Sequence, residues 1–240
     1  MLWNEKIILV AGGSSGIGKE VSLRLASSGA KVLILSRKYP EWIVENKNIS
    51  HEFWDAEDSS VFKKETLIEK LDGFVYCPGS INLKPFTNLK INEYKNDFQI
   101  NFLGVINLLQ SFFPALKKAE TSSIVLYSTV AVQTGISYHT SIASAKGALE
   151  GFTRSLAAEW SAHFIRVNAI ALSLTDTPLS SRLISSEEKK KNAISRHPLK
   201  RIGDAGETAD STIYLLSDAA SWMTGQILHL DGGISSIKPL

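Results

Sequence analysis

Cysteine is almost absent from this chain, since Cys77 is the only one in 240 residues. One thiol cannot form a disulfide framework within the chain, and it cannot build a metal site that depends on several cysteines. The spacing of His51, Glu57 and Asp58 does not suggest metal ligands either, so we interpret them as surface residues and expect no metal. The scarcity of cysteine favours a reducing compartment, and we expect a cytoplasmic protein.

The chain also lacks a strong charge of one sign and a long apolar run. Its formal net charge is +2, which is too small to indicate a nucleic-acid partner by itself. No apolar run approaches the length of about 20 residues that a membrane-spanning helix needs. Residues 1–6 show no signal-peptide pattern. These absences favour a soluble protein that acts on a small molecule, with neither nucleic acid nor membrane as partner.

Strand-like apolar runs alternate with helical patterns along the chain. The strands are expected at 7–10, 31–35, 49–54, 73–76, 123–127, 166–171 and 226–230, and the helices at 16–28, 58–70, 92–118, 141–161 and 207–217. Such alternation predicts an α/β fold with a parallel, doubly wound sheet of about seven strands. The sequence contains no repeat and no linker, so we expect a single domain over residues 1–240.

A glycine-rich segment follows the first apolar run directly. Residues 11–18 read Ala-Gly-Gly-Ser-Ser-Gly-Ile-Gly, and a helical pattern begins at once after them. Glycines let the backbone turn sharply and approach a pyrophosphate, and a helix N-terminus offers free N–H groups to an anion. We therefore predict a phosphate-binding turn that includes Gly12, Ser14, Ser15, Gly16, Ile17 and Gly18.

Two cations follow the second strand. In a doubly wound nucleotide-binding fold this position lies beside the adenosine ribose, where an acidic residue would favour NAD. Arg37 and Lys38 instead suit the 2′-phosphate of NADP, although a solvated basic turn is the alternative. The sequence favours NADP(H) over NAD(H).

The segment 178–200 differs from the rest of the chain. It is polar, includes the run Glu187-Glu188-Lys189-Lys190-Lys191, and shows no strand pattern. Ser185 with Glu188 three residues later fits a capping box, which predicts a short surface helix. The charges are read either as a solvated helix face or as part of a mobile lid over a substrate site.

Several motifs, in order along the chain, resemble the short-chain dehydrogenase/reductase family in its classical form, in particular its beta-ketoacyl-thioester reductases. They are the glycine segment, Asn101 within Gln-Ile-Asn-Phe-Leu-Gly, Lys146 within Ser-Ala-Lys-Gly-Ala-Leu-Glu-Gly, the strand Arg-Val-Asn-Ala-Ile from Arg166, and the ending Asp231-Gly232-Gly233. The resemblance implies a Rossmann-type fold and a nicotinamide cofactor. It also implies a homo-oligomer, a tetramer or a dimer, formed through the helices at 92–118 and 141–161 and the last strand.

The resemblance assigns roles to further residues. It places Asp55 at the adenine ring, Lys146 at the cofactor ribose, and Thr177 at the carboxamide or a phosphate. It also places Gly79 and Leu174 among the cofactor contacts, and Asn101 in a water relay of the active site. Thr129 stands where the family has a substrate-orienting serine, and a threonine hydroxyl can still donate.

The proton donor of the family is missing. That donor is a tyrosine four residues before the lysine, and here the position is Ile142, which cannot donate a proton. His139, seven residues before Lys146, is two helical turns away and would fall on nearly the same face. An unperturbed imidazole has a pKa of about 6.5, so His139 is a possible replacement acid. A loop histidine bound to backbone, Tyr138 and water are the alternatives.

Two functions remain open from the sequence. The first is an NADP-dependent oxidoreductase that reduces a ketone or a conjugated enoyl group, for example of an acyl thioester, with Asn101, Thr129, His139 and Lys146 in the active site. The second is a non-catalytic NADP(H)-binding sensor or subunit, which the loss of the tyrosine would suit.

Overall fold

The computed structural model describes residues 3–43, 46–60, 62 and 68–238. Its centre is a seven-stranded sheet in the order β3-β2-β1-β4-β5-β6-β9, and every pair of neighbours is parallel. The strands are β1 (Ile7–Ala11), β2 (Lys31–Ser36), β3 (Ile49–Phe53), β4 (Gly73–Tyr76), β5 (Ser122–Thr129), β6 (Ile165–Leu172) and β9 (Ile227–Leu230). The predicted doubly wound α/β fold is therefore confirmed.

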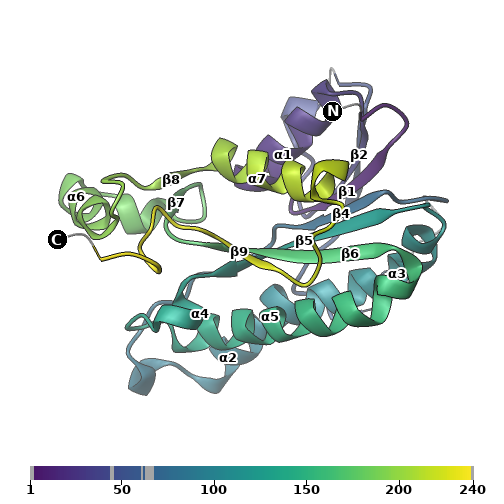
Figure 1. The fold of residues 1–240 in the computed structure, drawn as a ribbon. Helices are drawn as coiled ribbons and strands as arrows, with labels where there is room; N and C mark the ends of the chain where they lie inside the picture. The colour runs from purple at the N-terminus through teal and green to yellow at the C-terminus, as the bar shows by residue number, and fades with distance from the viewer. Residues whose placement is uncertain (1–2, 44–45, 61, 63–67, 239–240) are drawn as a thin grey trace.

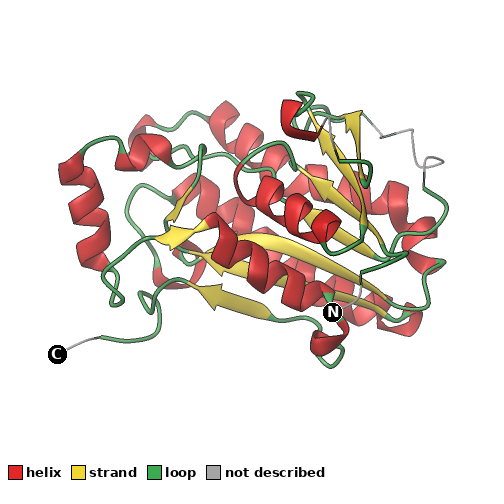
Figure 2. Ribbon diagram, turned by 90° about the horizontal axis from the view of Figure 1, so that it is seen from above, coloured by secondary structure: helices red, strands yellow, loops and turns green. Residues whose placement is uncertain are grey.

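Helices cover both faces of the sheet. Helices α1 (Gly16–Ser27) and α7 (Ala205–Leu216) lie on one face, and α2 (Ile91–Phe98), α3 (Gly104–Lys117) and α5 (Thr140–Trp160) lie on the other (Figure 1). In the view from above, helices of the near layer cross over the strands (Figure 2). A short helix α4 (Ala131–Thr134) follows β5.

Alternation along the strands divides the core into two layers. Leu9 and Leu126 belong to the cluster beneath α3 and α5, whereas their neighbours Val10 and Val125 belong to the cluster beneath α1 and α7. Successive side chains of a strand point to opposite faces, so a strand buried on both faces is apolar throughout. This is why the strands appear in the sequence as continuous apolar runs.

The helix predicted at 92–118 is interrupted. Between α2 and α3 the chain forms a π-helical turn over Gln99–Leu103, which carries Asn101. In the predicted helix at 58–70, residues 61 and 63–67 lie outside the described part of the chain, and the described residues 58–60, 62 and 68–70 are not helical. Residues 36–48 carry only a short 3-10 helix, Glu41–Ile43, among their described positions.

The stretch Ile91–Lys117 is long and apolar enough, by length and composition alone, to cross a membrane. Many of its apolar side chains pack within the chain, although Ile91 and Leu103 are exposed. Val105 and Leu109 are buried against the sheet, the Phe102 ring contacts Phe152, and the Phe113 ring stacks on Trp160 at 4.7 Å between centroids. The stretch is a core element of this fold.

The segment after β6 projects beyond the carboxyl edge of the sheet. It contains β7 (Thr175–Asp176), a 3-10 helix (Ser181–Ile184) and α6 (Glu187–Arg196), and β7 pairs with β8 (Gly203–Asp204) (Figure 1). The predicted surface helix is present, but the expected capping box at Ser185 is wrong by one residue. Ser186 is the N-cap, and its side chain accepts a hydrogen bond from the Lys189 backbone N–H.

Candidate active site

The site begins where the strand order reverses. The chain passes from β1 outward through β2 and β3, and then returns to place β4 on the other side of β1. In an open parallel sheet a crevice forms at such a point, outside the carboxyl ends of the strands. A groove of about 430 Å³ lies there, lined by the glycine segment, the end of β2, Asp55, Gly79 and Thr177.

The glycine segment has the backbone geometry of a phosphate cradle. Gly12 and Gly16 have φ of +75° and +53°, which L side chains rarely adopt. At Gly18 a Cβ atom would collide with the carbonyl oxygen of Gly12. Helix α1 starts at Gly16, has no side-chain hydrogen bond at its Ser15 N-cap, and has no acidic residue in its first turn. Its free N–H groups and positive dipole end therefore fit a pyrophosphate.

Trp42 supports this cradle, and the sequence analysis did not identify it. Its Nε1–H donates to the carbonyl oxygen of Ser14 at 3.0 Å. The Lys19 ammonium lies 5.6 Å from the centroid of the Trp42 ring. The Trp42 indole, in the short helix after β2, thus fixes the turn after β1. The only sequence signal for this contact is that a tryptophan occurs in an otherwise polar connection.

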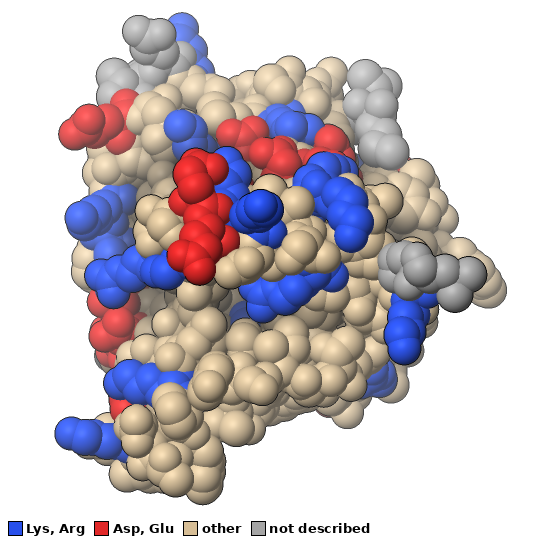
Figure 3. All heavy atoms as spheres, turned by 90° about the vertical axis from the view of Figure 1, so that its left-hand side faces the viewer, with Lys and Arg blue, Asp and Glu red and all other residues tan. Residues whose placement is uncertain are grey.

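The structure places both predicted cations in the groove, at the end of β2. Arg37 and Lys38 line it together with Asp55. The Arg37 guanidinium forms an exposed ion pair with Glu57 at 3.6 Å. Basic and acidic side chains are intermixed in the upper half of the face that carries α6 (Figure 3). This face therefore shows no extended basic surface, and the cations act locally at the groove.

A second cavity of about 330 Å³ continues from the groove, since Ile17, Cys77, Gly79 and Thr177 are among the residues that line both. The structure brings Asn101, Thr129, His139, Lys146 and Leu174 together around this cavity. Much of the wall is apolar: Ile81, Leu83, Val130, Ile136, Ile142, Leu172, Leu179, Leu183 and Ile234 line it as well. Its shape and lining suit a substrate with an apolar body.

Lys146 is the buried cation of this cavity. Its side chain is on α5, and the residue is 7% exposed. Burial lowers the pKa of its ammonium to about 8, because desolvation disfavours the charge. Burial also raises the pKa of the neighbouring Cys77 thiol to about 12. The half-buried Cys77 side chain is therefore a neutral thiol at pH 7.

Asn101 is fixed by a polar network that the sequence analysis missed. Its Nδ2 donates to Ser80 Oγ at 2.8 Å and to the Asp97 carbonyl oxygen at 2.9 Å. The buried Asp97 carboxylate accepts hydrogen bonds from Ser80, Asn82 and Ser141. Asn101 Oδ1 is buried and has no hydrogen-bond partner among the described residues. This orphaned acceptor lines the cavity, which fits a site that receives a polar ligand group.

The three positions considered for a proton donor differ in whether they line the cavity. Ile142 faces the cavity and offers no donor. His139 also lines it, but as the N-cap of α5 and not within the helix as expected, and its Nδ1 lies 2.8 Å from the Ser137 carbonyl oxygen. Tyr138 has a φ of 69°, is 57% exposed and is not part of the cavity wall. The structure therefore places His139, and not Tyr138, on the wall of the cavity that Lys146 lines.

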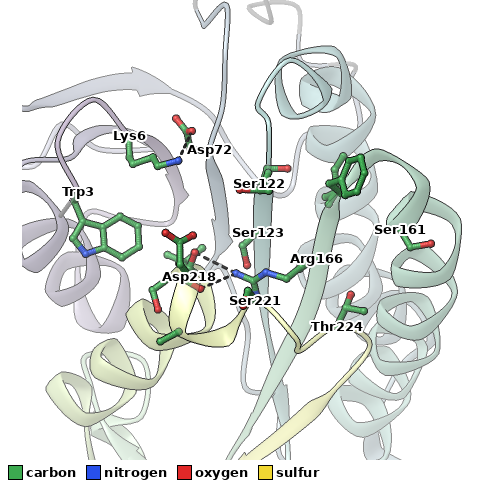
Figure 4. Close-up of a pocket in the computed structure, with 16 residues that line it drawn as sticks. Trp3, Lys6, Asp72, Ser122, Ser123, Ser161, Arg166, Asp218, Ser221 and Thr224 are labelled. Atoms are coloured by element: carbon green, nitrogen blue, oxygen red, sulfur yellow. Dashed lines mark hydrogen bonds and ion pairs between the residues drawn. The ribbon is translucent and has the colours of Figure 1, made fainter. Parts of the chain in front are cut away.

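A separate hollow of about 320 Å³ lies at the opposite, amino-terminal edge of the sheet (Figure 4). Three of its charged groups, Lys6, Asp72 and Arg166, already have partners. Lys6 binds Asp72 at 3.2 Å, and the Arg166 guanidinium donates to the carbonyl oxygens of Leu215, Leu216, Ser217 and Met223. Arg166 thus anchors the end of α7, and this hollow is distant from the glycine cradle.

The groove, the open helix terminus and the adjoining cavity with its buried lysine define a nicotinamide-dinucleotide-binding protein of the Rossmann type. A family model described as enoyl-(acyl carrier protein) reductase matches residues 11–235. A tropinone reductase homologue of Arabidopsis thaliana is 34% identical over 95% of this chain and 92% of its own length. One from Datura stramonium is 33% identical over 94% and 90%. The chain belongs to the short-chain dehydrogenase/reductase family.

Solved structures agree with this assignment. A short-chain dehydrogenase/reductase from Mycobacterium ulcerans superposes with a TM-score of 0.89 at 27% identity, over 98% of this chain and 91% of its own. The aldohexose dehydrogenase of Thermoplasma acidophilum gives 0.88 at 26% identity, over 99% and 97%. ElxO with NADP bound gives 0.88 at 25% identity, over 97% and 99%. The protein is thus similar to oxidoreductases throughout its length.

Proposed function

We propose that this protein is an NADP(H)-dependent reductase of a ketone or a conjugated enoyl group on a largely apolar substrate, an acyl thioester being one candidate. The observation that carries the proposal is the continuity of the groove with the cavity. One end holds Arg37 and Lys38, and the other end meets Lys146 and Thr129. Solved relatives with NADP bound support the cofactor.

The residues of the groove fit the cofactor. The free N–H groups at the start of α1 would receive the pyrophosphate, Lys38 and Arg37 the 2′-phosphate, Asp55 the adenine, and Lys146 the ribose beside the nicotinamide. Thr177 and Leu174 would border the nicotinamide ring. NADPH, when bound there, supplies the hydride.

The chain's own groups would orient the substrate and stabilise its charge. Thr129 Oγ1 accepts a weak hydrogen bond of 3.3 Å from the Ala131 N–H, which leaves its own proton free for a substrate oxygen. The Lys146 ammonium lines the same cavity and would stabilise the negative charge that develops on that oxygen. Two imidazoles, His139 and His197, also line the cavity, so a titratable proton source exists without a tyrosine.

The enoyl reaction suits this site especially well. Reduction of an activated alkene leaves an enolate, whose oxygen needs charge stabilisation more than an acid matched to the same step. A ketone leaves an alkoxide, which demands a proton at once. The apolar residue at position 142 therefore favours the alkene over the ketone.

The alternative is a protein that binds NADP(H) without transferring a hydride. The observation that favours it is again Ile142, which places an inert side chain in the cavity beside Lys146. A binding protein would keep the same groove and the same ribose contact. Turnover alone separates the two functions.

The test is NADPH consumption at 340 nm with acetoacetyl-CoA, crotonyl-CoA, tropinone and cyclohexanone as acceptors, and NADH as control. Turnover with any acceptor supports the reductase, and the acceptor shows whether a carbonyl or an alkene is reduced. His139→Ala, assayed in the same way, tests the donor predicted from the sequence, and unchanged turnover would remove His139 from the mechanism. NADPH binding without oxidation of any acceptor would favour the sensor.

We also propose a cytoplasmic homo-oligomer, and a lid formed by residues 178–200. The lid is supported by Leu179, Leu183 and Arg196, which come from this segment and border the cavity.

A further inference from the structure

Ser173 and His197 form a hydrogen-bonded pair at the cavity, and neither residue was singled out as a site residue in the sequence. The Ser173 Oγ lies 2.8 Å from His197 Nε2. On the other side of the ring, Nδ1 lies 2.8 Å from the Ala193 carbonyl oxygen. A carbonyl only accepts, so Nδ1 carries a proton, and in the neutral ring Nε2 accepts the proton of the Ser173 hydroxyl.

The ring has a fixed orientation relative to α6. His197 follows the last residue of α6 and is 3% exposed. Its Nδ1–H satisfies a carbonyl of the last helical turn, and its own backbone N–H donates to the Ile194 carbonyl at 3.1 Å. By contrast, His139 is held by the carbonyl of Ser137, two residues away in its own loop. Of the two imidazoles, only His197 is coupled to a hydroxyl.

Ser173 lines the same cavity as the residues that would bind the substrate oxygen, and it follows the strand end that pairs with Thr129. In the register of β5 and β6, Thr129 is the partner of Leu172, and Ser173 is the next residue of the chain. The Val130 N–H donates to the Leu172 carbonyl at 3.0 Å, which keeps the two strand ends together. Ser173, Thr129 and Lys146 line one cavity.

We propose that Ser173 is the catalytic residue that gives the proton to the reduced substrate, and that His197 acts through it as the source of that proton. This inference rests on the proposed reductase function. It assigns the donor role to a hydroxyl–imidazole pair in place of the missing tyrosine. Ser173 follows the last residue of β6, and His197 follows the last residue of α6.

The proton transfer balances with the groups present. When His197 is doubly protonated, Nε2–H donates to Ser173 Oγ and leaves the Ser173 O–H free to point at the substrate. The Ser173 O–H bond breaks as a new O–H bond forms on the alkoxide or enolate oxygen. The Nε2–H bond then breaks as the serine hydroxyl re-forms, and His197 becomes neutral. The hydride is the one the cofactor provides in the proposed function.

Charged groups approach the pair from two sides. Ser173 and His197 also line a smaller cavity of about 90 Å³, where Arg201, Glu207 and Asp231 are present. The larger cavity presents Lys146, His139 and Arg196. Arg201 is paired with Glu207 by two hydrogen bonds, and Asp231 accepts hydrogen bonds from Gly233 and Ser235, so these groups of the smaller cavity are already partnered. The pair thus lies between the substrate cavity and the smaller cavity, because both of its residues line both.

The experiment compares wild type with Ser173→Ala, His197→Gln, His139→Ala and Ser195→Ala. Glutamine can keep a hydrogen bond to Ser173 but cannot titrate. Ser195 is an exposed hydroxyl of α6 that bonds only to the Asn192 carbonyl, so its variant is the control for changes in that helix. NADPH turnover with acetoacetyl-CoA, crotonyl-CoA and tropinone is followed from pH 5.5 to 9, together with NADPH binding by fluorescence.

We expect Ser173→Ala and His197→Gln to lose about 100-fold or more in kcat, within the range of general acid catalysis. NADPH binding should change less than about threefold, and Ser195→Ala should behave as wild type. The fall of kcat with rising pH should disappear in His197→Gln and persist in His139→Ala. Unchanged turnover in Ser173→Ala, or a pH profile lost only in His139→Ala, would overturn the inference while leaving the reductase function intact.

A readout without turnover completes the test. Nitrogen-15 NMR of the imidazoles should show His197 protonated at Nδ1 when neutral, with an Nε2 resonance that shifts in Ser173→Ala. An Nε2–H tautomer would overturn the inference. If wild type oxidises NADPH with none of the acceptors, the proposed function fails, and this inference fails with it.

Discussion

Ile142 and Lys146 lie one helical turn apart on α5 and line the same cavity. In relatives with a tyrosine at the first position, the lysine lowers the pKa of the phenol. Here the buried ammonium faces an aliphatic side chain. The proposed reductase would therefore use this lysine at the ribose and would need another proton source in the cavity.

Ile142→Tyr should restore a phenolic donor beside Lys146. Ile142 lines the cavity, so we expect the larger ring to extend into that space. We expect turnover of a ketone acceptor to rise about 10-fold or more, and we expect the same substitution to rescue Ser173→Ala. Ile142→Phe, which has the ring without the hydroxyl, is the matched control. An equal effect of both substitutions would show that ring size, and not proton donation, is responsible.

Lys38→Gln should reduce the preference for NADPH. The ammonium borders the adenosine end of the groove, and a hydrogen bond to a charged group contributes about 1.5–3 kcal/mol. We expect the dissociation constant of NADPH to rise about 10-fold or more and that of NADH to stay the same, as measured by cofactor fluorescence. Arg37→Gln should have a smaller effect, because Glu57 already pairs with Arg37. Lys31→Gln, at the opposite end of β2, is the control, and equal losses for NADPH and NADH would contradict the assignment.

Gly18→Ala should destabilise the phosphate cradle. The new methyl group would meet the Gly12 carbonyl oxygen, which belongs to the backbone and cannot move aside easily. We expect a loss of about 1–3 kcal/mol in the free energy of unfolding and a loss of NADPH binding. Gly151→Ala is the matched control, because a Cβ there has no neighbour within 4 Å on α5. That variant should gain about 0.5–1 kcal/mol in urea unfolding. If Gly18→Ala and Gly151→Ala had equal free energies of unfolding, the predicted collision between the Gly18 methyl group and the Gly12 carbonyl oxygen would be refuted.

Lys146→Met should change how stability depends on pH. The folded protein releases the Lys146 proton near pH 8, whereas an unfolded lysine holds it to about 10.5. Between these values the unfolded chain binds more protons, so this group's contribution to the free energy of unfolding rises with pH. The cost of the buried charge, up to about 3 kcal/mol, is fully present below pH 8 and is relieved above it.

The variant should therefore be more stable than wild type at pH 7, and the difference should shrink by pH 10. Urea unfolding at pH 7, 8, 9 and 10 measures both curves. Parallel curves for the two proteins would mean that the Lys146 charge is compensated in the folded state.

Much of the cofactor groove could be predicted from the sequence because its features are local. Each feature follows a strand within a few residues of the sequence. These features are the glycine segment, the start of α1, and the cations Arg37 and Lys38. The spacing from Ile142 to Lys146 likewise lies within two turns of helix. Burial on both faces made the strands continuous apolar runs, so the order of elements was also visible.

The contacts across the site depended on the tertiary structure. Ser173 and His197 are 24 residues apart, Trp42 and Ser14 are 28, and Ser141 and Asp97 are 44. Periodicity shows which face of an element is buried, but it does not show which side chain of another element lies opposite. His139 illustrates the limit even at short range, because helical spacing assumed that the helix includes it, whereas α5 begins at Thr140. The sequence by itself determined a nucleotide-binding fold without the usual tyrosine. Packing at the carboxyl edge of the sheet decided which hydroxyl meets which imidazole, because that edge gathers the ends of strands distant in sequence.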